Sequence, residues 1–144
     1  MWVQRDGRSI TVEVRADGAG LVSHAGSALL AQIADKSGLT RALSVAFGGL
    51  RQRRSGHDPG RGVRDLAVML ADGGDCLADI GAIRDQGVLF GAVASDSTAF
   101  RVIGQIATTP GRLDALAAAH ARARAHVWKL CGAPDRVTID IARR

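Results

Sequence analysis

Residues 94–107 limit most strongly how this chain can fold, because they combine a helix start signal with a helical hydrophobic period. Ser95 or Ser97 can accept a hydrogen bond from a backbone N–H of a first helical turn, and Asp96 suits the positive end of a helix dipole. Four apolar residues then recur on one side of the predicted helix, namely Ala99, Val102, Ile103 and Ile106. The spacing predicts an amphipathic helix with that side in the core.

The other side of this predicted helix is a strip of hydrogen-bonding side chains formed by Thr98, Arg101, Gln105 and Thr108. Arg, Gln and Thr can contact base edges or phosphate oxygens when a helix lies in a DNA groove. The strip could also be the solvated face of an ordinary helix, and periodicity alone favours that interpretation.

The distribution of charge favours a polyanionic partner. The net charge is +5, but residues 65–98 hold six Asp and one Arg, a local charge of −5, so the rest of the chain carries +10. Clustered basic charge attracts nucleic acid first and membrane surfaces second. Aromatic residues make up only 3% of the chain, which argues against the stacking platforms that bind single strands. A DNA duplex read by helices is therefore the favoured partner.

Two segments supply candidate phosphate contacts. Residues 51–64 contain five Arg against one Asp, and we predict that Arg53 and Arg54 contact phosphates, although a solvated loop is an open alternative. An Ala-rich helix is predicted after the cap Thr109–Pro110, ending before Gly132. Its outer strip holds Arg122, His126 and Lys129, which are either phosphate contacts or a solvated face. Trp128 is expected in the core.

The remaining patterns predict a mainly α fold, a helical bundle with helix-turn-helix-like elements. Helices are expected over 28–36, from Thr40, over 63–71 and over 76–85, with the glycine turn 72–75 between the last two. A short N-terminal strand is expected at 9–15 and an incomplete strand from 136. Because Asp79 and Asp85 would repel phosphate, the helix 76–85 is predicted to be a scaffold, and the helix from Ser97 to enter the groove.

Other reactive side chains have structural explanations. Cys76 and Cys131 are expected to be buried thiols, without a zinc site. Helix caps and exposed faces account for Asp65, Asp72, Asp75 and Asp79 without a metal. His57 and Asp58 are adjacent in a turn, so they are not expected to converge on one substrate atom. The sequence shows no signal peptide and no bilayer-length apolar run, which predicts a cytoplasmic protein without membrane contact.

Taken together, the chain resembles the N-terminal region of bacterial insertion-sequence transposases of the DDE type. The resemblance covers nearly the whole chain, and its motifs are specific in combination rather than singly. They are LVSHAG (21–26), GLT (38–40), HDPG (57–60), DLAVMLADGGDCLAD (65–79), LFGAVASDSTAFR (89–101) and VTID (137–140).

The resemblance implies a helical DNA-binding N-terminal domain, residues 1–134, followed by the start of a truncated RNase H-like catalytic domain, residues 135–144. In this family three carboxylates hold two divalent metal ions, with Mg²⁺ implied. Asp140 matches the first carboxylate, but Ala142 stands where the family pattern Asp-x-Asp-x-Thr has its second Asp. We therefore expect an incomplete catalytic set and no cofactor for this fragment, and we leave its enzymatic status open.

The expected function is DNA binding in transposition. Phosphates would be contacted by Arg53, Arg54, Arg122 and Lys129, and base edges by Thr98, Arg101 and Gln105. The expected partner is the double-stranded terminal repeat of an insertion sequence, bound in the nucleoid, with a homodimer as a further possibility. The alternatives are a helical module for dimerisation or protein interaction, and an inactive transposase remnant.

Overall fold

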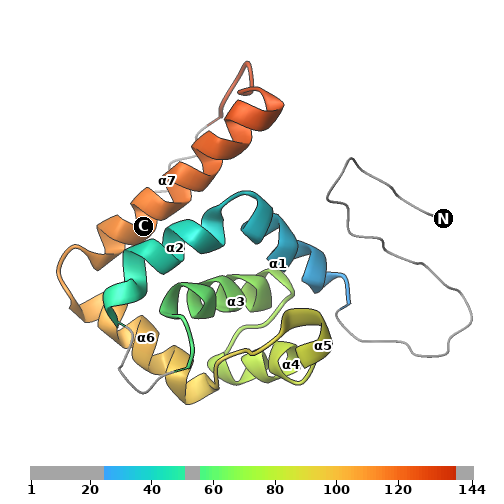
Figure 1. Cartoon of the computed structure of the whole chain (residues 1–144), viewed down its shortest axis with the longest axis vertical. Helices are drawn as coiled ribbons and strands as arrows, with labels where there is room; N and C mark the ends of the chain where they lie inside the picture. The colour runs from blue at the N-terminus through green and yellow to red at the C-terminus, as the bar shows by residue number, and fades with distance from the viewer. Residues whose placement is uncertain (1–24, 51–55, 139–144) are drawn as a thin grey trace, which may run out of the picture.

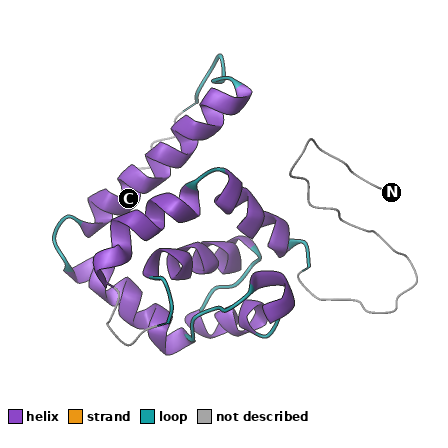
Figure 2. Ribbon diagram, viewed as in Figure 1, coloured by secondary structure: helices purple, strands orange, loops and turns teal. Residues whose placement is uncertain are grey.

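The computed structural model describes residues 25–50 and 56–138, and all the regular structure in these ranges is helical (Figures 1 and 2). This confirms the prediction of a mainly helical fold. The helices are α1 (Ser27–Lys36), α2 (Leu39–Phe47), α3 (Pro59–Ala71), α4 (Ile80–Arg84), α5 (Gly87–Phe90), α6 (Asp96–Thr108) and α7 (Arg112–Cys131), with 3-10 turns η1 (Gly48–Leu50) and η2 (Leu77–Asp79).

Helix α3 is the centre of the bundle, in contact with α1, α2, α4 and α6 (Figure 1). Two apolar clusters lie around it. The first cluster includes Ala28, Ala31, Leu66, Met69, Ile80, Ile83 and Phe90. The second includes Leu43, Phe47, Val102, Ile106 and Ala119. Because α6 supplies Ala99 to the first cluster and Val102 and Ile106 to the second, its position is fixed by both.

Local signals set the helix ends, as predicted for α6 and α1, whereas α3 begins at Pro59, four residues before its predicted start at Val63. The Ser95 hydroxyl accepts a hydrogen bond from the Thr98 N–H at 3.4 Å, so Ser95 caps α6. Gly38, which follows α1, has a φ of 76°, as expected for a left-handed helix end. The carboxylate of Asp58 accepts a bond from the Gly60 N–H at 2.8 Å, and Pro59 is the first residue of α3.

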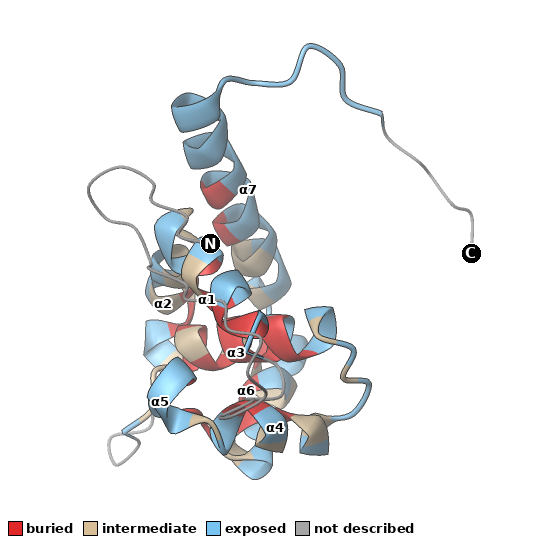
Figure 3. Ribbon diagram, turned by 90° about the vertical axis from the view of Figure 1, so that its right-hand side faces the viewer, coloured by how far each residue is buried: buried red, intermediate tan, exposed pale blue. Residues whose placement is uncertain are grey.

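The C-terminal helix differs from its prediction at both its start and its core face. It begins at Arg112 after Gly111, whose φ is 77°, whereas Thr109 ends α6. Only Ala119 and Ala123 are buried, and every residue of α7 after Ala123 is exposed because the helix extends beyond the bundle (Figure 3).

The predicted burial of four side chains is wrong. Trp128 is 38% exposed, with the Arg124 guanidinium carbon 5.5 Å from its ring centroid. Cys131 lies at the end of the same projecting helix and is exposed, and Cys76 is exposed beside η2. Ile103 of α6, expected in the core, is 41% exposed, since the neighbouring helices cover only the side that carries Ala99, Val102 and Ile106.

The predicted strands are not part of the described fold. Residues 9–15 lie outside the described residues, and so do residues 139–144. Arg136, Val137 and Thr138 form no strand. Helices α3 and α4 are joined through the turn at residues 72–76 and by η2, and they contact each other.

The contact between α2 and α3 depends on the absence of a side chain at Gly60. A Cβ atom there would lie 2.1 Å from the backbone nitrogen of Ser44 and 2.3 Å from the Leu43 carbonyl carbon. Neither backbone atom can move without displacing α2, so only glycine fits at this point of the α2–α3 interface.

We predict that Gly60→Ala lowers the free energy of unfolding by about 3 kcal/mol or more, because the new methyl group forces the two helices apart. Gly104→Ala is the matched control, since a Cβ at this α6 position meets nothing within 4 Å. It should raise the unfolding free energy by about 0.5–1 kcal/mol through helix propensity. Urea unfolding followed by circular dichroism measures both. Equal stability of the two variants would contradict the proposed close approach.

Candidate functional site

The predicted reading strip borders a groove on the surface of the bundle. Thr98, Arg101 and Gln105 of α6 lie along this groove, opposite His57 and Pro59 at the start of α3. Arg101 is exposed, and Thr98 and Gln105 are half-buried. The strip is thus accessible from outside and is not closed by the neighbouring helices.

Hydrogen bonds hold the Arg101 side chain along its own helix. Its Nε donates to the Ser97 carbonyl oxygen at 3.3 Å, and its Nη2 donates to the Thr98 hydroxyl at 3.1 Å. The Ser95 hydroxyl also donates to Thr98, at 3.1 Å. The cap of α6 and the guanidinium are therefore linked through one threonine hydroxyl.

The fourth member of the strip has a different role. The Thr108 hydroxyl donates to the Gly104 carbonyl oxygen one turn earlier in α6, at 2.8 Å. The hydroxyl has only one hydrogen, and this bond within the helix uses it. In contrast, the Thr98 hydroxyl is the acceptor in its bonds with Arg101 and Ser95.

The predicted phosphate contacts are only partly described. Arg53, Arg54 and Asp140 lie outside the described residues. Arg122 and Lys129 are exposed on α7, and neither lines the groove beside α6. The structure brings Thr98, Arg101 and Gln105 together and leaves the two α7 cations on a separate surface.

Several arginines that contribute to the positive charge have structural roles instead. Arg112 Nη1 donates to the Ala46 carbonyl oxygen at 2.6 Å, which ties α7 to α2. Arg61 Nη2 donates to the Phe90 carbonyl oxygen at 2.7 Å. Arg64 is only 3% exposed. The basic segment 51–64 is therefore not wholly an exposed arm, because its last residues form the first turns of α3.

The position of Asp65 contradicts the expectation of a cap or an exposed face. Asp65 is 1% exposed within α3, and the Nε of Arg64 lies 2.9 Å from its Oδ1. Burial raises the pKa of this carboxyl to about 6, although the positive charges of Arg64 and Arg61 lower it. Sequence reasoning missed this pair because adjacent residues with opposite charges are usually solvated.

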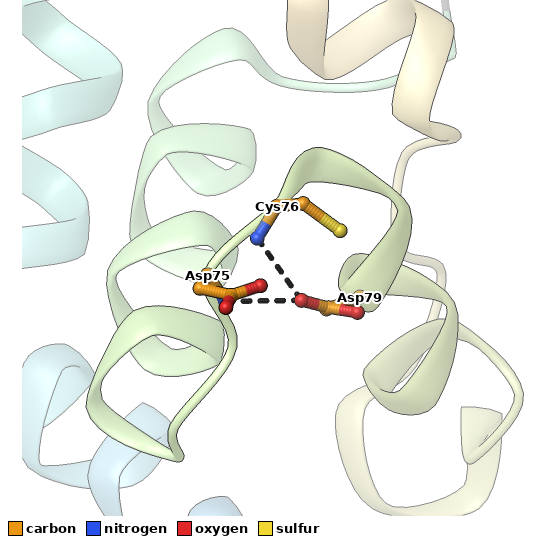
Figure 4. Close-up of side chains that lie close together, drawn as sticks. All are labelled: Asp75, Cys76 and Asp79. Atoms are coloured by element: carbon orange, nitrogen blue, oxygen red, sulfur yellow. Dashed lines mark hydrogen bonds between the residues drawn. The ribbon is translucent and has the colours of Figure 1, made fainter.

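Asp75, Cys76 and Asp79 form the cluster of possible metal ligands in the described part of the chain, with ligand atoms within 4.8 Å of one another (Figure 4). One Asp79 carboxylate oxygen accepts from the backbone N–H groups of Asp75 and Cys76, at 3.0 Å each. These bonds lower the pKa of Asp79 and give it the capping role that the sequence predicted. A thiol among two carboxylates does not match the all-oxygen set that Mg²⁺ prefers.

No helix in the described ranges is both long enough and apolar enough to cross a membrane.

The raised pKa of Asp65 predicts how stability depends on pH. The folded state binds this proton more tightly than the unfolded chain, whose Asp pKa is 3.8. Protonation of Asp65 therefore stabilises the folded state increasingly as the pH falls through about 6 towards 4. When the pH is lowered from 7 to 4, the free energy of unfolding of the wild-type chain should rise by about 2 kcal/mol relative to that of Asp65→Asn. Urea unfolding at both pH values measures this.

Asp85→Asn is the control for this measurement, because the Asp85 side chain is 78% exposed. Its stability relative to the wild-type chain should change little between the two pH values. A wild-type chain that loses stability relative to Asp65→Asn on acidification would contradict the raised pKa.

Comparison with known proteins identifies the family. The family model described as Transposase DDE domain group 1 matches residues 4–143, almost the whole chain. No curated protein and no solved structure matches. The match includes every described helix and does not itself divide the chain into domains. On this match, the chain belongs to the DDE transposase domain group 1 family.

Proposed function

We propose that this chain binds duplex DNA during transposition and that the α6 strip is its reading surface. The supporting observation is that Thr98, Arg101 and Gln105 lie together along one accessible groove. Membership of a transposase family makes DNA the expected partner. Arg and Gln have the donor patterns that pair with guanine and adenine edges in the major groove.

In this proposal α6 enters the groove, and α3 with α4 support it as in a helix-turn-helix. Helix α4 is an unsuitable reader because it has only five residues and Asp85, directly after it, is exposed. Helix α6 has 13 residues, a capped start and an exposed polar side. Binding a base with Arg101 would exchange its bonds to Ser97 and Thr98 for bonds to the DNA.

Phosphate contacts in this proposal come from Arg122 and Lys129 on α7, together with Arg53 and Arg54. These side chains would anchor any duplex, because phosphate contacts carry no sequence information. We further propose the terminal repeat of an insertion sequence as the specific duplex.

Self-association is the second candidate function, and the projecting half of α7 favours it. Leu130 is 68% exposed, and Val127 and Trp128 are 37% and 38% exposed. Native mass measurements with and without DNA separate the two candidates. A dimer that is insensitive to salt, together with no duplex binding at low salt, would favour self-association.

We predict that Arg101→Ala weakens binding to the terminal-repeat duplex by about 1–3 kcal/mol, with a much smaller loss on a scrambled duplex, because a base contact is removed. Arg84→Ala is the matched control, since Arg84 is also an exposed helical arginine but lies on α4, away from the groove. It should leave both affinities almost unchanged. Fluorescence anisotropy measures the affinity of each variant for each of the two duplexes. Equal losses on both duplexes would argue against base reading by Arg101.

Lys129→Ala should behave differently, weakening binding to both duplexes alike. Loss of one phosphate contact should also reduce the slope of log affinity against log salt by about 1. The same anisotropy assay at several salt concentrations measures this slope. An unchanged slope would exclude Lys129 from the phosphate contacts.

A further inference from the structure

The groove beside α6 contains a small apolar hollow. Its lining combines exposed or half-buried polar residues, the reading strip among them, with half-buried Leu50 of η1 and with buried residues. The buried lining residues are Pro59, Gly62, Ala94, Ala99 and Val102. The part of the lining that solvent reaches is mostly apolar. The reading strip therefore borders a hollow with an apolar floor and is not a flat polar face.

Gly62 of α3 keeps this hollow open. It is buried, yet a Cβ atom built on it meets no other heavy atom within 4 Å. Two residues earlier, a Cβ at Gly60 would collide with the backbone of α2. Packing thus requires glycine at position 60 and does not require it at position 62. Because glycine inside a helix is less stable than alanine, Gly62 needs another explanation, and the open hollow beside it supplies one.

The size of the hollow limits what it can hold. Its volume is about 30 Å³, which is room for roughly two water-sized groups. A methyl group fits this space and a whole base ring does not. Water is a poor occupant, because most of the accessible lining offers it no hydrogen-bond partner.

We infer that the hollow receives the 5-methyl group of a thymine in the bound duplex, an inference that rests on the DNA binding proposed above. In the major groove thymine presents the acceptor O4 together with its methyl group. The amide of Gln105, which lines the hollow, can donate to that O4. Cytosine presents an amino donor and has no methyl group, so it matches neither feature.

The carboxylate in the lining does not oppose this contact. Oδ1 of Asp58 accepts from the Gly60 N–H at 2.8 Å, and Oδ2 accepts from the Ser44 hydroxyl at 2.6 Å. Both oxygens are thus engaged within the protein, where they fix the start of α3. The guanidinium of Arg101 lines the same hollow, so the polar part of the lining also carries positive charge towards a base edge that accepts hydrogen bonds.

The test removes the methyl group from the DNA. Each thymine of the terminal-repeat duplex is replaced in turn by deoxyuridine, which differs from thymidine only by that methyl group. Fluorescence anisotropy then measures the affinity of the full chain for each duplex and for a scrambled duplex. We expect affinity to fall about fourfold at one thymine of the bound site, as burial of one methyl-sized group predicts, with little change at the others.

A protein variant tests the same contact from the other side. Gly62→Ala adds a methyl group at the hollow, so it should weaken binding to the thymine duplex about fourfold and remove the difference between thymine and deoxyuridine. Gly104→Ala is the matched control, because its Cβ also meets nothing within 4 Å but Gly104 does not line the hollow. It should keep the fourfold difference. Circular dichroism should show that both variants are folded.

The outcomes separate this inference from the proposed function. Preference for the terminal repeat without any thymine that is sensitive to loss of its methyl group would overturn the inference and leave the proposed DNA binding intact. A folded Gly62→Ala variant that still discriminates thymine from deoxyuridine fourfold would also overturn the inference. Equal binding of the terminal repeat and the scrambled duplex by the wild-type chain would overturn sequence reading by α6, and this inference with it.

Discussion

The close approach of α2 and α3 is the constraint on which the rest of the structure depends. At Gly60 the backbones of the two helices are so near that no side chain fits between them. Beside this contact, the Asp58 carboxylate caps α3 and also accepts a hydrogen bond from the Ser44 hydroxyl at 2.6 Å. One glycine and one aspartate thus fix the start of α3, which forms one wall of the α6 groove.

The buried charges of α3 show a different kind of constraint. Arg64 and Asp65 lie in the interior, next to each other in sequence, although removing charges from water is costly. Their neighbour Arg61 is held by the Phe90 carbonyl oxygen. The interior around α3 is therefore apolar where Leu66 and Met69 lie. It holds charged side chains where Arg64 and Asp65 lie.

Features that depend on local physics were predictable from the sequence. The capped start of α6, the end of α1 at Gly38 and the polar strip of α6 follow from residues within one or two helical turns. The polar side of α6 could be predicted because its side chains recur at helical spacing.

Features that depend on distant neighbours were not predictable. Trp128 is exposed because none of the described helices packs against the end of α7, and its apolar character gives no sign of this. Asp65 is buried because α3 lies at the centre of the bundle, and no local pattern marks that position. The strand predicted at 9–15 and the site residues Arg53, Arg54 and Asp140 fall outside the described residues, so these stay predictions.

The length of α7 beyond the bundle would set the reach of the proposed phosphate contacts. From Arg124 to Cys131 the helix adds eight residues past its last buried side chain, a length of about 12 Å. That length corresponds to three or four base pairs at about 3.4 Å each. With α6 in a groove, a cation near the end of α7 would meet the backbone well outside the bases that α6 contacts. The footprint of this small bundle on a duplex would then exceed the width of its core.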